Sequence, residues 1–165
     1  MTTISDRNEW LEPDGLGGFA SGTVSGVRTR RYHALLLTAT TPPTGRVVLV
    51  NGVDAWVETD GAAHALSTQH YEPGVRHPDG SMCISAFTTE PWPTWTFSLP
   101  CGATIEHTIT VQRGTPAVAL AWRLIQRGDV QSGDGTDRVT LRVRPFLSGR
   151  DYHGMQRENE NKGQN

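Results

Sequence analysis

The sequence predicts an all-β protein built as an antiparallel β-sandwich, with little or no helix. Short runs of apolar and β-branched residues recur along the chain, and turn sequences rich in Gly, Pro and Asp separate them. The 18 glycines and 10 prolines fit this punctuation. The segments TIEHTITVQ and RVTLRVRP alternate polar and apolar residues, as half-buried antiparallel strands do. Many short strands at regular spacing are typical of two packed sheets.

Ten segments carry the strand pattern: residues 19–25, 31–38, 46–50, 54–59, 63–68, 82–88, 94–99, 103–112, 117–127 and 138–145. The segment NEWLEPD, which precedes the first of these, is polar and has Pro13 near its end, so it is not expected to form a strand. Asp60 and Gly61 are expected to form a hairpin turn, and QSGDGTD a long polar loop. Trp95 and Phe97 alternate within one strand, which favours a place in the core over a stacking platform for sugars.

Length and charge limit the classes of protein to consider. The 165 residues suffice for one domain with a core, and a net charge of −2 gives no basic excess that would indicate a nucleic-acid partner. The start MTTISDRNEW has neither the basic nor the apolar region of a signal peptide, and every apolar run is too short to span a membrane. We therefore expect a cytoplasmic protein with no membrane partner, in which Cys83 and Cys101 are free thiols.

A glycine-rich run, PDGLGGFASGTVSG, raises the possibility of a nucleotide-binding loop. The spacing of Gly15, Gly17 and Ala20 fits the loose dinucleotide fingerprint. That fingerprint requires a strand before the run, a helix after it and an acidic residue about 20 positions further on. The segment after the run has the pattern of a strand, and no acidic residue occurs from Gly15 to Val53. We therefore interpret the run as a structural loop, shaped by glycines at positions 15, 17, 18 and 22.

Two clusters combine guanidinium, phenol and imidazole groups, which suit sugar hydroxyls and carboxylates. The first cluster, RTRRYHALL, holds Arg28, Arg30, Arg31, Tyr32 and His33. In an alternating strand its Arg31 and His33 would face one way and Tyr32 the other. The structural alternative is a salt-bridged strand with a core tyrosine.

The second cluster, GRDYHG, comes just after the last expected strand, where the chain leaves the sandwich. It comprises Arg150, Asp151, Tyr152 and His153. Such a compact set in a loop favours a functional site, and the alternative is an exit loop with an internal Arg–Asp pair.

Motifs for catalysis, metals or cofactors are missing from the sequence. The six histidines show no zinc spacing, and no Gly-x-Ser-x-Gly nucleophile motif occurs. Glycoside hydrolysis needs two facing carboxylates, and no such pair stands out among the scattered acids. We therefore assign no catalytic residue, no metal and no cofactor.

A long N-terminal segment, EWLEPDGLGGFASGTVSGVRTRRYHALLLTATTPPTGRVVLVNGVD, closely resembles the start of bacterial and archaeal glycogen debranching enzymes of the amylo-α-1,6-glucosidase type. The match includes Glu-Trp-Leu at 9–11, Gly15–Gly18, Ala20–Thr23, Thr29–His33 and the Pro-Pro-x-Gly-Arg turn at 42–46. The chain departs from that pattern at Asp14, Phe19, Arg28 and Ala34. The segment RPFLSGRDYHGMQREN also resembles the end of the same domain.

The resemblance implies a supersandwich-like N-terminal domain at residues 9–153, preceded by a tail at 1–8. The polar composition of QRENENKGQN predicts a disordered tail at 154–165. This domain would pack against an (α/α)₆ barrel that carries the catalytic acid and base, and would help to shape a site for an α-glucan such as glycogen or limit dextrin. The glycine run would then be a tight strand–loop–strand presented to the barrel. The residues expected at the interface and at the rim of the sugar cleft are Arg30, Arg31, Tyr32, His33, Arg150, Asp151, Tyr152 and His153.

Three other interpretations remain open. A free-standing carbohydrate-binding module predicts that Trp92 or Trp56 is exposed. A purely structural docking domain predicts an exposed apolar patch rimmed by Arg and Tyr. An enzyme in its own right would need Asp54, Glu72 or Glu106 in its active site.

Overall fold

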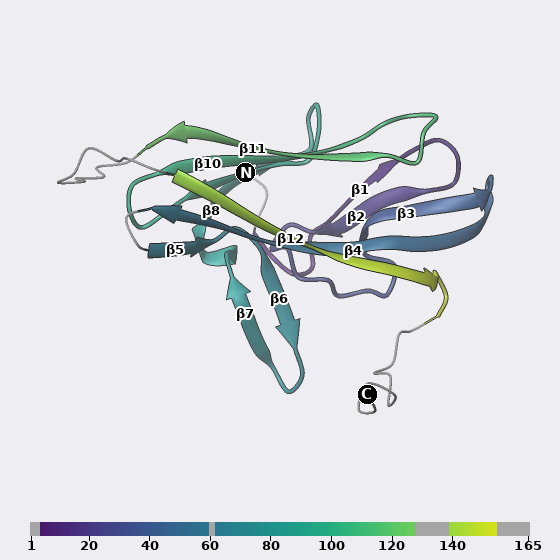
Figure 1. Ribbon diagram of the computed structural model, residues 1–165, viewed down its shortest axis with the longest axis horizontal. Coiled ribbons are helices and arrows are strands. Elements are labelled where there is room, and N and C mark those ends of the chain that lie inside the picture. Colours follow the sequence, from purple (N-terminus) through teal and green to yellow (C-terminus); the bar gives the residue numbers. More distant parts are fainter. Residues whose placement is uncertain (1–3, 60–61, 128–138, 155–165) are drawn as a thin grey trace, which may run out of the picture.

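The computed structural model describes residues 4–59, 62–127 and 139–154 (Figure 1). Nearly all regular structure in these residues is β-strand, and a single 3₁₀ turn, η1 (Ser81–Cys83), interrupts it. The strands are β1 (Glu9–Pro13), β2 (Phe19–Thr23), β3 (Ala34–Thr41), β4 (Thr44–Thr59), β5 (Ala62–Ala65), β6 (Thr68–Tyr71), β7 (Val75–Asp79), β8 (Ile84–Thr88), β9 (Thr94–Ser98), β10 (Thr104–Val111), β11 (Val118–Gln126) and β12 (Val139–Asp151).

The strands form two antiparallel sheets and one separate hairpin. The larger sheet has the order β1-β2-β3-β4-β12, with β5 also paired to β4, and the smaller sheet has the order β11-β10-β9-β8. The hairpin β6–β7 projects from the two sheets (Figure 1). Two sheets packed face to face confirm the predicted all-β sandwich. In the described part of the chain, no helix has the length and apolarity that a membrane crossing requires.

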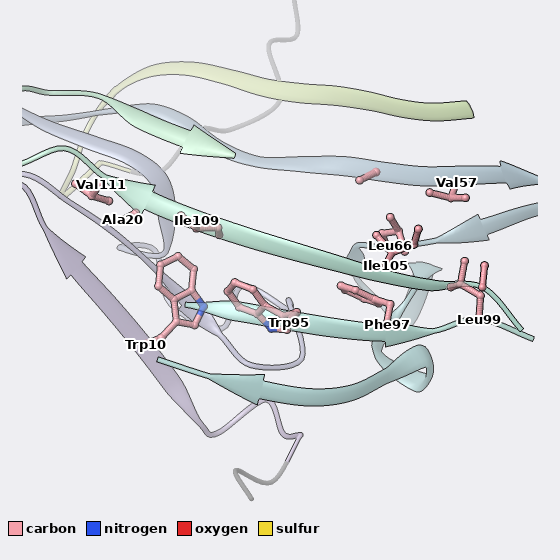
Figure 2. Packing of buried hydrophobic residues seen from close by; sticks show 12 residues of the cluster. Trp10, Ala20, Val57, Leu66, Trp95, Phe97, Leu99, Ile105, Ile109 and Val111 are labelled. Carbon is pink, nitrogen blue, oxygen red and sulfur yellow. The ribbon is translucent and has the colours of Figure 1, made fainter. Parts of the chain in front are cut away.

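The core lies between the two sheets and is organised around two tryptophans (Figure 2). Trp10 on β1 meets Trp95 on β9 edge to face, with ring centroids 5.5 Å apart. The strand β10 alternates half-buried and buried residues along its whole length, so its alternating sequence does place one face inward. Trp95 and Phe97 are 5% and 3% exposed, which confirms their predicted place in the core.

The prediction that residues 8–14 form no strand was wrong. Glu9–Pro13 form β1, which pairs with β2 from Glu9 opposite Thr23 to Pro13 opposite Phe19. Because β1 is the edge of its sheet, Pro13 can close the strand without breaking a ladder on a second side.

Three other strand boundaries differ from the sequence prediction. Residues 46–50 and 54–59 belong to one strand, β4, rather than two. The strand expected from Arg31 begins only at Ala34, because residues 31 and 32 form a turn. The last strand continues to Asp151 instead of ending at Pro145, so Arg150 and Asp151 lie in β12 and not in an exit loop.

The hairpin β6–β7 was not predicted, because Pro73 and Pro78 argue against strands. Pro73 lies in the turn and Pro78 lies in β7, a strand paired only with β6. The predicted hairpin at Asp60 and Gly61 agrees with the pairing of β4 and β5, in which Thr59 faces Ala62. The two turn residues themselves, the loop at 131–137 and the tail from 155 onward lie outside the described residues.

The glycine run joins β1 to β2 as a strand–loop–strand, as the family resemblance implied. Asp14 is buried, and its Oδ1 accepts hydrogen bonds from the backbone N–H groups of Leu16 (2.7 Å) and Gly18 (2.9 Å). Gly17 has φ +102°, and a Cβ there would lie 2.6 Å from the carbonyl oxygen of Pro43. The glycines therefore allow the loop to lie directly on the turn between β3 and β4.

Gly17→Ala should lower the free energy of unfolding by at least about 3 kcal/mol, because it combines backbone strain with a steric clash. Gly15→Ala is the matched control: its φ is +79°, but a Cβ there would meet nothing within 4 Å. The control should cost only about 1 kcal/mol. Urea unfolding of the two variants measures the difference, and equal losses would contradict the close packing on Pro43.

A buried histidine lies in the middle of the core. The ring of His107 stacks on Trp122 with centroids 4.4 Å apart and on Trp95 with centroids 5.6 Å apart. Its Nδ1 lies 3.0 Å from the carbonyl oxygen of Ala121, so Nδ1 carries a proton and donates it. Burial lowers the pKa of His107 to about 4, and the bond to Ala121 only partly opposes this shift.

The buried His107 should make stability fall with acidification. Its folded-state pKa of about 4 is below the unfolded value of 6.5, so its contribution is complete above pH 6.5 and is lost as the pH falls to about 4. The loss should reach about 3 kcal/mol. The measurement is the unfolding free energy of the wild type and of His107→Phe across this range. The wild type should lose more unfolding free energy on acidification than His107→Phe. Parallel dependences of the two proteins on pH would contradict the assignment of this loss to His107.

Candidate functional site

The two Arg-Tyr-His motifs come together in the structure, although they lie at opposite ends of the described chain. The turn at residues 28–33 precedes β3, and the second motif lies at the end of β12. Arg31 Nη1 donates to the backbone carbonyl of His153 at 3.1 Å. The hydroxyl of Tyr32 lies 3.3 Å from Nδ1 of His153. We call the residues 30–33 and 150–153 the paired-motif surface.

Aromatic rings hold the paired-motif surface together. Tyr32 and Tyr152 pack with ring centroids 5.0 Å apart, and Tyr152 contacts His153 at 3.9 Å. Two guanidinium groups lie over these rings: Arg31 over Tyr32 at 5.0 Å and Arg46 over Tyr152 at 5.5 Å. Tyr32 therefore belongs to this surface cluster, where it is half-buried, and it is not part of the sandwich core.

Arg150 fixes the backbone of both motifs through neutral acceptors. Its Nη2 donates to the carbonyl oxygen of Arg31, and its Nη1 donates to the carbonyl oxygen of Gly154 at 3.0 Å. Longer contacts of 3.5 Å reach the carbonyl oxygen of Tyr152 and Oδ1 of Asn51. The predicted alternative, an internal pair of Arg150 with Asp151, is not what the structure shows. The Oδ1 of Asp151 instead accepts the backbone N–H of His153 at 2.8 Å.

His33 is the buried member of the paired-motif surface, and Glu9 connects it to Arg30. Glu9 Oε1 lies 2.5 Å from Arg30 Nε and 3.6 Å from His33 Nε2. The N–H of Thr29 donates to His33 Nδ1 at 3.2 Å, so the proton of the neutral ring is on Nε2 and faces Glu9. Burial lowers the pKa of His33, and the Glu9 charge partly opposes this lowering.

A cleft of about 990 Å³ opens beside the paired-motif surface. The turn at 28–33 forms one wall, residues 145–147 and 150 of β12 form another, and His70 and Tyr71 of β6 form the third. Its volume is within the range of small-molecule sites. Four arginines line this cleft, and none of its described lining residues is acidic.

The acidic residues considered for catalysis do not form a site. Asp54 is fully buried, and its carboxylate is held by Arg144 and by the Nε2 of Gln69 at 3.0 Å. Glu106 lies in the other sheet and pairs with Arg123 at 2.8 Å. Glu72 lies in the turn of the β6–β7 hairpin. Among the residues that the structure describes, no group of His, Cys, Asp and Glu could hold a metal ion.

A second, more apolar groove of about 580 Å³ lies near the turn between β10 and β11. Trp92 lines it together with Gln112 and Arg113, and Trp92 is 38% exposed. Trp56 is half-buried, and the guanidinium of Arg144 lies 5.8 Å above its ring. Of the two tryptophans, Trp92 is therefore the more accessible to a ligand.

The fold and the site define a β-sandwich domain with a polar, arginine-rich cleft and no candidate metal centre in its described residues. A family model described as the N-terminal part of glycogen debranching enzyme matches residues 8–165, essentially the whole chain. The chain belongs to this family. Comparison with curated proteins and with solved structures gave no significant match.

The structure brings all eight predicted surface residues together, but their roles differ. Arg31 and His153 are exposed and Tyr32 and Tyr152 are half-buried between them, whereas His33 is buried and Arg150 supports the backbone. The sequence did not predict four neighbours of these residues: Glu9, Asn51, His70 and Tyr71. No spacing signal marks these residues, because they reach the site from different strands.

Arg150→Gln should lower the free energy of unfolding by about 2 kcal/mol and should speed hydrogen exchange in residues 28–33, because several carbonyl oxygens lose a charged donor. Arg142→Gln on the same strand is the control. Arg142 pairs with Glu58 at 3.1 Å while 67% exposed, so its loss should cost less than about 1 kcal/mol. Urea unfolding and exchange of the two variants provide the comparison. Unchanged exchange at 28–33 in Arg150→Gln would contradict the supporting role.

Proposed function

We propose that this chain is the non-catalytic N-terminal β-sandwich of a cytoplasmic glycogen-debranching glycoside hydrolase. It packs on an (α/α)₆ catalytic barrel and helps to shape the site for an α-glucan such as glycogen or limit dextrin. The observation that carries the proposal is the paired-motif surface, where two distant Arg-Tyr-His segments meet beside a cleft. These side chains hydrogen-bond sugar hydroxyls and pair with carboxylates of a partner. The free thiols of Cys83 and Cys101 fit a reducing compartment.

An open side of the sandwich supports docking of a partner domain. Strands β11 and β12 each end their sheet, and neither has an outer neighbour among the described strands. On β12, Leu141 pairs with Val57 of β4, and Val143 pairs with Ala55. Paired residues of neighbouring strands point to the same face, and Val57 and Ala55 are buried, so Leu141 and Val143 also point inward. Both residues are nevertheless 41% exposed. The inner face of β12 is therefore only partly covered.

The inner face of β11 is incompletely covered as well. Its residues Val118, Leu120, Trp122 and Leu124 pack on the core cluster but are only partly buried. In Figure 2, β11 and β12 run on the same side of the labelled core residues. Exposed apolar surface of this kind is typical of protein interfaces. Arg123, Arg142 and Arg144 alternate with these inward residues and lie on the outer faces of the two strands, where most of each side chain is exposed.

The catalytic acid and base would then lie on the barrel. Glycoside hydrolysis needs two carboxyl groups placed across the scissile bond. In the described residues, Asp6, Glu9, Asp54, Glu58 and Glu106 are engaged in ion pairs with arginines. These five carboxylates are therefore held in structural contacts, which supports placing the catalytic pair outside them.

A second candidate function is a free-standing carbohydrate-binding module. The observation that favours it is the groove at Trp92, whose half-exposed indole can pack on the apolar face of a sugar ring. A Trp92 fluorescence change on titration with a maltooligosaccharide, in the absence of any barrel, would distinguish this function from docking.

The docking proposal predicts that the purified chain releases no glucose from a branched limit dextrin and binds a separately produced catalytic barrel of the same family. Leu141→Lys should weaken this binding at least about tenfold, because it puts a charge on the apolar inner face of β12. Calorimetric titration measures the affinity, and a glucose assay measures the activity.

Thr140→Lys is the matched control for this experiment. Thr140 is the neighbour of Leu141 in β12 and points to the other face, so the same charge should change the affinity less than about threefold. Equal weakening by the two variants would contradict the docking face. Steady glucose release by the chain alone would show that the active site lies within these residues and would overturn the proposal.

A further inference from the structure

The arginines that line the cleft differ from those elsewhere in how their charge is compensated. On other surfaces Arg76, Arg123, Arg142 and Arg144 each pair with a carboxylate. Within the cleft only Arg30 has such a partner, Glu9. Arg28, Arg31 and Arg150 form no ion pair with any described residue.

The contacts of these three arginines are to neutral groups. Arg150 donates to backbone carbonyl oxygens, and Arg31 donates to the carbonyl oxygen of His153 while covering the ring of Tyr32. Arg28 lies over the ring of Phe146 at 5.6 Å and makes no hydrogen bond in the described part of the chain. Hydrogen bonds to carbonyls position a guanidinium but leave its charge uncompensated. Three positive charges therefore face one cleft in a chain whose net charge is −2.

Arg28 is the arginine with the most unused hydrogen-bonding capacity. The residue as a whole is exposed, and it lines the cleft. The surrounding protein desolvates its guanidinium and lowers its pKa, and the charge of Arg150 acts in the same direction, while Tyr71 and Asp54 oppose the shift. Gly52 leaves the space that this guanidinium occupies, since a Cβ there would overlap Nη1 of Arg28. The position of Arg28 is thus defined by its neighbours.

We propose that this cleft binds a phosphate monoester carried by a sugar. A phosphate monoester has a charge near −2 and three acceptor oxygens, which match guanidinium groups in a two-pronged geometry. The cleft, about 990 Å³, is far larger than a phosphate group and has Asn51, His70 and Tyr71 on its walls to contact the sugar. This inference does not rest on docking to a barrel, because the site lies within this chain.

The test is calorimetric titration of the purified chain at fixed ionic strength with glucose 6-phosphate, inorganic phosphate and glucose. Glucose 6-phosphate should bind at least about fivefold more tightly than inorganic phosphate, and glucose should not saturate the site. Equal affinity for the two phosphates would overturn the assignment to a sugar ester. If neither phosphate binds and a glutamate-rich peptide does, the cleft is a site for carboxylates of a partner, and the proposal is overturned.

Two variants locate the site. Arg28→Gln should weaken glucose 6-phosphate binding about tenfold to a hundredfold, since it removes a charged donor. Gly52→Ala keeps every charge but displaces the Arg28 guanidinium, so it should also weaken binding. Arg123→Gln, in the other sheet, is the control with the same charge change and should alter the affinity less than about twofold. Unchanged binding in Arg28→Gln would overturn the placement of the site in this cleft, and so would equal weakening in Arg123→Gln. A thermal melt of each variant confirms that it is folded.

Discussion

The contact between Trp10 and Trp95 joins the two sheets, and the arrangement of the surface depends on it. The two indoles meet edge to face at 5.5 Å, and each comes from a different sheet. Trp95 also donates its Nε1–H to the carbonyl oxygen of Val24 at 2.8 Å. Val24 directly follows β2, at the start of the segment that leads to the turn at 28–33. One buried side chain therefore sets the sheet packing and holds the beginning of the segment that carries the first Arg-Tyr-His motif.

Much of the fold could be predicted from local sequence, and the exceptions have physical causes. The alternating sequence of β10 predicts its buried face correctly, because period-2 patterning is a property of the strand itself. The strands β1 and β7 were missed because a proline excludes a strand only where both neighbours need its N–H, and sequence does not show which strands are edges. Residue patterns identified the site as two separate motifs, and only the family resemblance placed them on one surface. Their meeting depends on the register of β12 against β4, which no local pattern contains.

Identical residue types in the site have different roles, and only tertiary contacts distinguish them. Arg150 has its donors committed to backbone carbonyls, whereas Arg28 rests on an aromatic ring with its N–H groups free within the described structure. His33 and His153 belong to the two motifs, yet one is buried beside Glu9 and the other is exposed against Tyr32. A motif therefore identifies where a surface lies, while burial and hydrogen bonding decide which of its members can meet a ligand.

The length of β12 ties two surfaces to one stretch of backbone. Its first residues present Leu141 and Val143 at the open side of the sandwich, and its last residues place Arg150 behind the turn at 28–33. Because side chains alternate along a strand, adding or removing one residue between these parts would turn one of the two surfaces to the wrong face. During divergence of the family, this segment can accept substitutions at either surface much more readily than a change in length.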